Sequence, residues 1–361
     1  MTQTFPSTMF GVQLMGHGGL DKLVYKHDIP TPQLGDDDVL VKVGAAGVNN
    51  TDINTRIGWY SKSVTSGTDT GASDGFNDLN EDDASWAGEP IPFPRIQGAD
   101  VAGVIVAAGK NVDANRIGER VLLCAMQPDP DTPYQCATQG SETDGGFAEF
   151  TKVNSRNAFA INTSLSDAEL ASFPCAYSTA ENLLDRANVQ AGEVVLVTGA
   201  SGGVGSAAVQ LIKRRGAKVI AICGKEKEAR LQALGVDTTV PRGQSLVSTL
   251  GEMSVDVVID LVAGPQFPEL LAVLKRGGRY AVSGAIGGPI VELDVRTLYL
   301  KDLSFFGGTY QAPHVFKNLV KYIENGELTP LVAKTYPLED IQQAQTDFLA
   351  KGFVGKLVLI P

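Results

Sequence analysis

The clearest hydrophobic pattern in the chain is a run of four apolar residues over 194–197 that leads directly into a glycine-rich segment. Small and apolar residues at helical spacing follow over 206–213, and a second apolar run occupies 218–222. This order predicts a strand, a tight turn, a helix and a second strand parallel to the first. Units of this kind, with right-handed crossovers, build doubly wound sheets.

Strands and helices continue to alternate toward the end of the chain. Apolar runs predict strands over 255–259, 278–283, 303–306 and 356–360, and helical spacing predicts helices over 268–275, 314–324 and 338–351. The first 160 residues differ, because glycines and prolines separate short apolar runs at 39–43, 101–106 and 146–150. We therefore predict an α/β protein with a β-rich N-terminal domain and a doubly wound parallel sheet after it.

The segment between the first of these strands and its helix reads TGASGGVG. Small residues let backbone amides approach a pyrophosphate, and the helix N-terminus adds oriented N–H groups and a partial positive charge. We expect a dinucleotide to bind against Gly199, Ser201, Gly202, Gly203, Val204 and Gly205. The alternative is a tight strand–helix turn that binds nothing.

The overall composition narrows the function classes. The chain has 361 residues, a net charge of −11 and no basic run, so a nucleic-acid partner is not expected. No apolar stretch reaches the roughly 18–20 residues of a membrane span, and the N-terminal residues lack the pattern of a secretory signal. The four cysteines are widely scattered, which favours reduced thiols and a cytoplasmic location over disulfides.

Residues 61–93 form an acidic segment, with seven acidic residues and a single lysine. It is rich in glycine, serine and aspartate, which is typical of a solvated insertion loop. Because Tyr60 immediately precedes it, a lid beside an active site is the alternative. A calcium loop is disfavoured, since the spacing of the aspartates does not match the EF-hand pattern.

Five segments together resemble the medium-chain dehydrogenase/reductase superfamily. They are GVNNTDINTRIGWY (47–60), GADVAGVIVAAG (98–109), GGFAEF (145–150), the glycine turn and GKLVL (355–359). This superfamily includes zinc alcohol dehydrogenases, quinone oxidoreductases and enoyl-thioester reductases. The resemblance implies a GroES-like catalytic domain made of 1–160 and 307–361, a Rossmann domain over 161–306, and an active site in the cleft between them.

By the same resemblance, the three catalytic zinc ligands of the alcohol dehydrogenases fall at Asn49, Ala99 and Cys175. Only the cysteine is a ligating type, and catalytic zinc needs three protein ligands. The structural zinc lobe of those enzymes uses four closely spaced cysteines, where this chain offers only Cys124 and Cys136. We therefore predict no metal site. A conjugated acceptor can be reduced without one, because hydrogen-bond donors suffice to stabilise a delocalised enolate or hydroquinone anion.

The resemblance points to three residues near the reacting atoms. Tyr60 matches a tyrosine that donates a proton in the enoyl-thioester reductases and lines the pocket in many quinone reductases. Thr51 matches the proton-relay hydroxyl of the zinc enzymes, and Asn49 is expected to hydrogen-bond the nicotinamide ribose or the substrate oxygen. Each of the three has an alternative role as a loop residue whose polar groups are satisfied within the protein. Asp52 is expected to be structural.

The resemblance also supplies residues for the nicotinamide side of the cofactor. Thr179 is expected to pack on the nicotinamide ring. Two strand ends are expected to flank it, and they comprise Val262, Ser283, Gly284 and Ala285. Lys356 either reaches the cofactor or is a surface cation.

The choice between NAD and NADP depends on the end of the second strand of the turn unit. That strand ends Cys223–Gly224–Lys225, without the carboxylate that holds the adenosine ribose in NAD enzymes. Because a lysine there attracts a 2′-phosphate, we predict that Gly224 and Lys225 bind NADPH. Glu226 is the residue that opposes this prediction.

These observations lead to one function and two alternatives. We expect a zinc-independent, NADPH-dependent oxidoreductase that transfers hydride to a small molecule, either a quinone or an α,β-unsaturated carbonyl compound such as an enone or enal. The first alternative is an enoyl-thioester reductase acting on a coenzyme A ester, and the second is a non-catalytic NADPH-binding relative. Family analogy predicts a homodimer that pairs through the edge strand at Leu303–Phe306.

Overall fold

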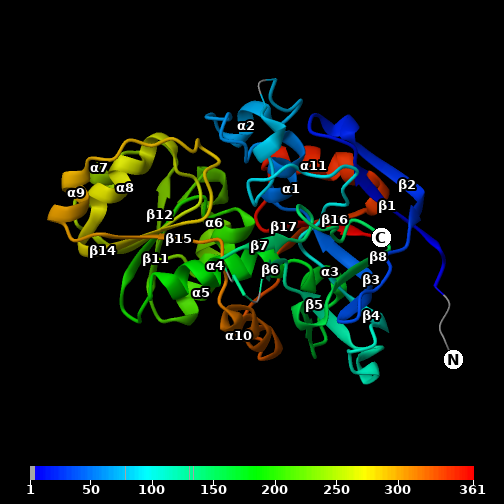
Figure 1. The fold of residues 1–361 in the computed structure, drawn as a ribbon. Coiled ribbons are helices and arrows are strands. Elements are labelled where there is room, and N and C mark those ends of the chain that lie inside the picture. Colours follow the sequence, from blue (N-terminus) through cyan, green and yellow to red (C-terminus); the bar gives the residue numbers. More distant parts are fainter. Residues whose placement is uncertain (1–4, 78, 130, 133) are drawn as a thin grey trace.

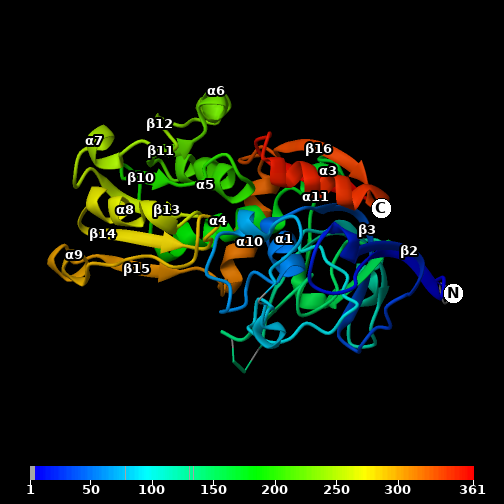
Figure 2. The ribbon, with the colours of Figure 1, turned by 90° about the horizontal axis from the view of Figure 1, so that it is seen from above.

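The computed structural model describes residues 5–77, 79–129, 131–132 and 134–361. Figure 1 shows two lobes side by side. One is built on the strands of residues 194–307, and the other on strands that come before and after them in the chain. Seen from above, α1 (Asn50–Ile57) and α4 (Pro174–Arg186) lie toward the junction of the lobes (Figure 2).

One lobe contains a six-stranded parallel sheet in the order β12-β11-β10-β13-β14-β15. Its strands are β10 (Val194–Val197), β11 (Lys218–Cys223), β12 (Thr238–Pro241), β13 (Val255–Asp260), β14 (Leu274–Val282) and β15 (Ser304–Gly307). The strand order reverses between β10 and β13, so the glycine turn after β10 lies at the topological switch point, where open α/β sheets bind ligands. This confirms the predicted doubly wound sheet.

The other lobe is β-rich, as predicted. Its main sheet has seven strands in the order β16-β17-β3-β4-β5-β9, with β8 also paired to β3. These strands are β3 (Asp38–Gly47), β4 (Ala102–Ala108), β5 (Arg120–Leu123), β8 (Phe150–Asn154), β9 (Ala158–Ala160), β16 (Val332–Pro337) and β17 (Lys356–Ile360). Two small hairpins complete the lobe, one of β1 (Thr8–Leu14) with β2 (Leu23–Pro30) and one of β6 (Met126–Pro128) with β7 (Cys136–Thr138).

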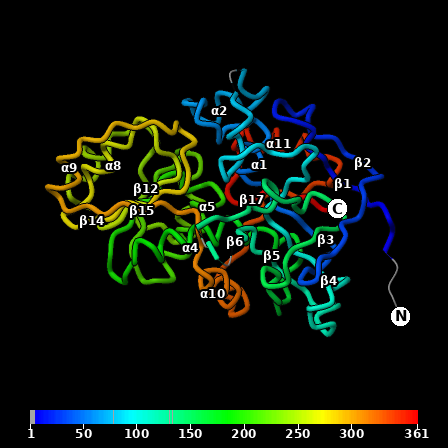
Figure 3. Tube along the Cα trace, in the orientation of Figure 1, coloured from blue at the N-terminus to red at the C-terminus, as the bar shows by residue number. Residues whose placement is uncertain are grey.

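The C-terminal segment returns to the β-rich lobe. Val358 and Leu359 of β17 pair antiparallel with Gly47 and Ala46 of β3. In Figure 3 the red end of the chain accordingly runs among the blue strands of its beginning. This pairing carries Lys356, the first residue of β17, into the region between the lobes.

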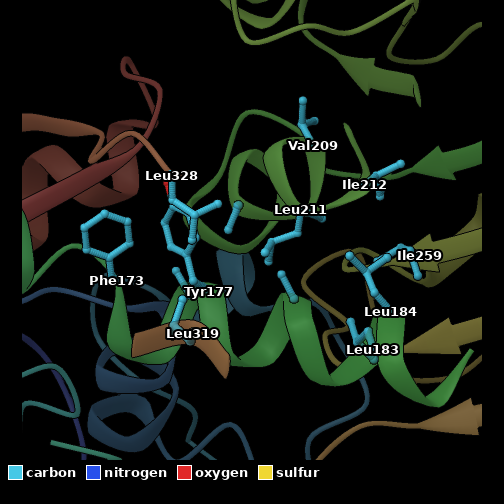
Figure 4. Close-up of a cluster of buried hydrophobic side chains, with 14 of the residues drawn as sticks. Phe173, Tyr177, Leu183, Leu184, Val209, Leu211, Ile212, Ile259, Leu319 and Leu328 are labelled. Atoms are coloured by element: carbon cyan, nitrogen blue, oxygen red, sulfur yellow. The ribbon is translucent and has the colours of Figure 1, made fainter. Parts of the chain in front are cut away.

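A shared apolar core joins the two lobes through α4. Figure 4 shows Tyr177, Leu183 and Leu184 of α4 packed against Leu211 and Ile212 of α5 (Gly203–Arg214). The same cluster includes Ala45 and Leu122 of the β-rich lobe, both fully buried. Helix α10 (Pro313–Glu324) packs on α4 as well.

The other helices are short or lie on the outside of the lobes. They are α2 (Thr68–Gly71), α3 (Asp167–Leu170), α6 (Glu228–Ala233), α7 (Leu246–Leu250), α8 (Phe267–Val273), α9 (Val295–Leu300) and α11 (Ile341–Ala350). No helix among the described residues is long and apolar enough to cross a bilayer.

The predicted strand at 146–150 is wrong except at its last residue. Backbone amides of Gly145, Gly146 and Phe147 donate to the carbonyls of residues 96–98, at 2.8–2.9 Å. Their partner is an irregular loop, and a Cβ on Gly145 would come within 2.4 Å of the Gly98 carbonyl oxygen. The glycines therefore serve close backbone packing, and regular pairing starts only with β8.

Candidate active site

The glycine turn that links β10 to α5 has little room for side chains. Gly199 adopts a left-handed conformation with φ +58°. A Cβ on Gly205 would lie 2.3 Å from the Gly199 carbonyl oxygen, so only glycine fits there. Gly202 precedes the first residue of α5, Gly203. The candidates Ser201 and Val204 belong to the same turn, so the six predicted residues share one helix N-terminus at the switch point.

An aspartate that sequence reasoning missed fixes the neighbouring strand end. Asp260, the last residue of β13, accepts a hydrogen bond from Thr198 Oγ1 at 2.6 Å and one from the Tyr280 hydroxyl at 2.6 Å. It also accepts the amides of Val262 at 2.9 Å and Ala263 at 3.0 Å. This network positions Val262 against Gly199. Its only sequence signal was an acid at the end of a mostly apolar strand.

A narrow cavity lies between the lobes. Its lining from the first half of the chain comprises Thr51, Trp86, Ala99, Ala125, Met126 and Thr138. The rest of its lining comes from α4 and later segments and comprises Cys175, Ser178, Thr179, Ser283, Gly308, Thr309 and Gln311. The fold thus brings three predicted site residues, Thr51, Thr179 and Ser283, around one space. Gly284 and Ala285 continue the loop from Ser283, and a Cβ on Gly284 would lie 2.8 Å from the Leu261 carbonyl oxygen.

A pair of hydroxyl groups lies beside the cavity, because Thr51 lines it and Tyr60 is hydrogen-bonded to Thr51. The Tyr60 hydroxyl donates to Thr51 Oγ1 at 3.0 Å, and the Tyr60 ring contacts the ring of Trp86, with centroids 5.3 Å apart. Burial raises the pKa of Tyr60 far above its usual value near 10, so the phenol remains protonated. Tyr60 therefore carries its proton at neutral pH and can act as a hydrogen-bond donor.

A buried ion pair occupies the position of the first zinc ligand. Lys356 Nζ lies 2.5 Å from Asn49 Oδ1 and 2.7 Å from Asp100 Oδ2, and the two charged side chains are 3% and 0% exposed. Asn49 Nδ2 donates to the same Asp100 oxygen at 2.8 Å, and the Cys175 amide donates to the other at 2.5 Å. The alternative that Lys356 is a surface cation is therefore wrong. Its aliphatic chain also passes Gly203, where a Cβ would lie 3.0 Å from Cδ.

The residues at this position do not fit a catalytic zinc ion. Asn49 already uses its side-chain oxygen as an acceptor from Lys356, and Ala99 has no donor atom. Burial and the nearby Asp100 charge raise the pKa of the Cys175 thiol to about 12, whereas zinc binds the thiolate. The Lys356 ammonium would also repel a divalent cation. Among the residues that the structure describes, no three His, Cys, Asp or Glu side chains form a group that could hold a metal.

Asp52 has the structural role that was expected. It forms a capping box with Asn49 at the start of α1, accepting the Asn49 amide at 2.7 Å, and it accepts the Gly98 amide at 3.2 Å. Its carboxyl is buried, and burial raises its pKa to about 7. Asp52 therefore joins α1 to the loop that carries Ala99 and Asp100.

The end of β11 presents charges of both signs. Gly224 is followed by the exposed Lys225 and Glu226, and a Cβ on Gly224 would lie 2.3 Å from a Glu226 carboxylate oxygen. The exposed Arg242, at the end of β12, donates its amide to the Cys223 carbonyl at 2.8 Å. Sequence reasoning missed Arg242, because the short strand Thr238–Pro241 was not predicted. A second cation thus lies beside the predicted ribose position.

A glycine turn at the switch point on one side of a cleft, with hydroxyl groups on the other, is the arrangement typical of nicotinamide-dependent dehydrogenases and reductases. Comparisons with known proteins agree. Residues 35–163 match the model of the alcohol dehydrogenase GroES-like domain, and residues 203–325 match that of the zinc-binding dehydrogenases.

Relatives cover almost the entire chain. It is 29% identical to human quinone oxidoreductase, with 98% of both chains covered. It is 32% identical to the acryloyl-coenzyme A reductase of Metallosphaera sedula, over 74% of this chain and 84% of the relative. A solved structure from Sinorhizobium meliloti 1021, assigned as an alcohol dehydrogenase, has a TM-score of 0.88 and 45% identity, covering 99% and 98% of the two chains. The chain belongs to the medium-chain dehydrogenase/reductase superfamily and is an oxidoreductase of that group.

Proposed function

We propose that the protein is a zinc-independent, NADPH-dependent reductase of quinones or α,β-unsaturated carbonyl compounds. The observation that carries this proposal is the Lys356–Asp100–Asn49 network at the metal position, beside a cavity that joins Thr179 and Ser283 to the Thr51–Tyr60 hydroxyl pair. Without a Lewis acid, hydride transfer favours acceptors whose product anion is delocalised. The similarity to human quinone oxidoreductase supports the same class of acceptor.

The residues on one side of the cleft bind the cofactor, and those on the other side act on the acceptor. The nicotinamide cofactor, when bound, supplies the hydride. The N-terminus of α5, with Gly202 and Gly203, is suited to the pyrophosphate, while Thr179 and Ser283 bound the cavity on the nicotinamide side. The Tyr60 hydroxyl, hydrogen-bonded to Thr51, donates the proton that the reduced acceptor takes up. Asn49 acts as a positioning residue, because it connects α1 to Asp100 and Lys356.

The direct test is a panel of acceptors assayed with each cofactor. We expect oxidation of reduced nicotinamide with quinones and with enones or enals, and none with simple ketones or aldehydes. Oxidation with simple ketones alone would contradict the proposal. Cofactor binding without oxidation by any acceptor would favour a non-catalytic relative.

Preference for NADPH is supported by Lys225 and Arg242 at the ends of β11 and β12, and opposed by Glu226. We expect kcat/KM to favour NADPH over NADH by about tenfold or more, because Lys225 and Arg242 attract a 2′-phosphate. Lys225→Glu should reverse the preference, and the matched variant Glu226→Gln should increase it. A wild-type preference for NADH would refute this assignment.

Reduction of an enoyl-thioester is the second candidate, and the Metallosphaera sedula relative favours it. The acidic 61–93 segment disfavours the phosphate-bearing coenzyme A moiety. Comparing crotonyl-coenzyme A with the free enone of the same chain length separates the two, because our proposal requires the free enone to be the better acceptor.

We also propose a homodimer through the edge strand β15, and a cytoplasmic location, which the wide scatter of the four cysteines along the sequence supports. Phe305 of β15 is 38% exposed, and Tyr299 and Leu300 of the adjacent α9 segment are 60% and 57% exposed. Light scattering should show two chains for the wild type and for the control Ile117→Glu, an exposed apolar site in the other lobe, and one chain for Phe305→Glu. A monomeric wild type would contradict the dimer.

A further inference from the structure

Trp86 is the only aromatic residue among the described residues that line the cavity. It comes from the acidic 61–93 segment, outside the motifs that identify the superfamily. Its indole contacts the Tyr60 ring at 5.3 Å between centroids, with the planes inclined by 51°. The insertion therefore supplies an aromatic surface directly beside the proton-donating pair.

A closed turn holds this indole in place. The Ser85 amide donates to the Glu89 carbonyl at 3.1 Å, and the Glu89 amide donates to Ser85 Oγ at 3.0 Å. The Ala87 amide donates to Glu142 Oε1 at 2.9 Å, while Glu142 Oε2 accepts the amide of Thr138, another cavity residue, at 2.8 Å. Glu142 thus ties the turn that carries Trp86 to the strand that carries Thr138.

The insertion also touches both lobes. A Cβ on Gly67 would lie 2.5 Å from the carbonyl oxygen of Ile286, in the loop that follows Ser283. Thr68 Oγ1 donates to Asn54 Oδ1 of α1 at 3.0 Å, and Lys351 Nζ donates to Asp69 at 2.6 Å. The segment is therefore packed against both lobes beside the cavity.

We propose that Trp86 determines acceptor specificity by packing its indole against planar, conjugated acceptors, so that the protein prefers bicyclic quinones to small acyclic enones. This inference rests on the proposed function, since the acceptor must enter this cavity. An aromatic pair contributes up to about 1.4 kcal/mol beyond the area it covers, which corresponds to about a tenfold effect on relative affinity.

The experiment compares kcat/KM for 1,4-naphthoquinone and 3-buten-2-one. In Trp86→Ala the ratio should fall about tenfold, through KM for the quinone, and in Trp86→Phe by no more than about threefold. The matched control is Trp59→Phe, because Trp59 contacts Tyr60 at 5.8 Å but does not line the cavity. An unchanged ratio in Trp86→Ala, or an equal loss for both acceptors, would overturn the proposal.

A binding measurement keeps this inference separate from the proposed function. The chain has two tryptophans, so Trp59→Phe leaves Trp86 as the only one. Naphthoquinone should quench the Trp86 emission of Trp59→Phe saturably. It should not saturably quench the Trp59 emission that remains in Trp86→Phe. Quenching without turnover would refute the proposed function and retain the stacking. Turnover without quenching would refute the stacking alone, even if Trp86→Ala fails to fold.

Discussion

The two sides of the cleft are encoded over very different distances along the chain. On the cofactor side, the turn that approaches the pyrophosphate lies within residues 199–205. On the acceptor side, Lys356 reaches Asn49 across 307 positions, and Asn49 and Cys175 reach Asp100 across 51 and 75. The close approach of backbone atoms determines the residues on the cofactor side. Interactions between buried charged groups determine those on the acceptor side. Substitutions on the two sides should therefore fail in different ways.

The largest effect is expected for Lys356→Met. It leaves Asp100, which is 0% exposed, without its cation, and breaking a buried pair costs about 3–5 kcal/mol. Urea unfolding should show this loss, and Asp100→Asn in the same background should recover part of it. Lys356→Arg is the charge-conserving control. A Lys356→Met variant as stable as the wild type would contradict the network.

On the cofactor side, Gly205→Ala should cost roughly 2–4 kcal/mol and weaken cofactor binding at least tenfold, because the new methyl group would overlap the Gly199 carbonyl oxygen. The matched control is Gly202→Ala, whose Cβ would lie 3.5 Å from the same oxygen. Thermal unfolding compares the two variants, and cofactor titration is applied to Gly205→Ala alone, because Gly202 is itself expected to contact the pyrophosphate. Equal effects of the two variants would show that close packing does not explain the turn.

The buried Asp52 gives the acceptor side a pH dependence of its own. Its pKa is about 7 in the folded protein, against an ordinary value of 3.8. Between pH 3.8 and 7 the folded protein therefore keeps a proton on Asp52 that the unfolded chain loses. The free energy of unfolding is thus highest at low pH and falls as pH rises through 7. Relative to Asp52→Asn, the wild type should lose roughly 2 kcal/mol between pH 5 and 7. A constant difference across that range would contradict the raised pKa.

The smallest expected effect on stability, but a clear one on chemistry, belongs to Tyr60→Phe. It removes the donor while keeping the ring against Trp86. We expect kcat with an enone to fall at least tenfold, with KM little changed. Thr51→Val should have a smaller effect in the same direction. An unchanged kcat in Tyr60→Phe would show that Tyr60 does not donate the proton.

The sequence was sufficient for the parts of the protein that depend on local pattern. The strand–turn–helix at 194–214 and the closing strand were predictable because apolar periodicity and glycine sterics act over a few residues. The Lys356–Asp100 pair was not predictable, since a lysine in a terminal strand has the same local sequence whether it is buried or exposed. Arg242 and Asp260 were missed for related reasons: one follows a strand too polar to predict, and the other acquires its role only from Thr198 and Tyr280. The position of Trp86 could not be predicted either, because it depends on the path of an insertion whose sequence has no hydrophobic periodicity.

We propose that hydride transfer here proceeds beside a lysine ammonium rather than a metal ion. The measurement that tests it most directly is NADPH oxidation by 1,4-naphthoquinone, with elemental analysis of the same chelator-treated sample. We predict undiminished kcat/KM with far less than one zinc per chain. Activity that disappears on chelation and returns with stoichiometric zinc would contradict the account.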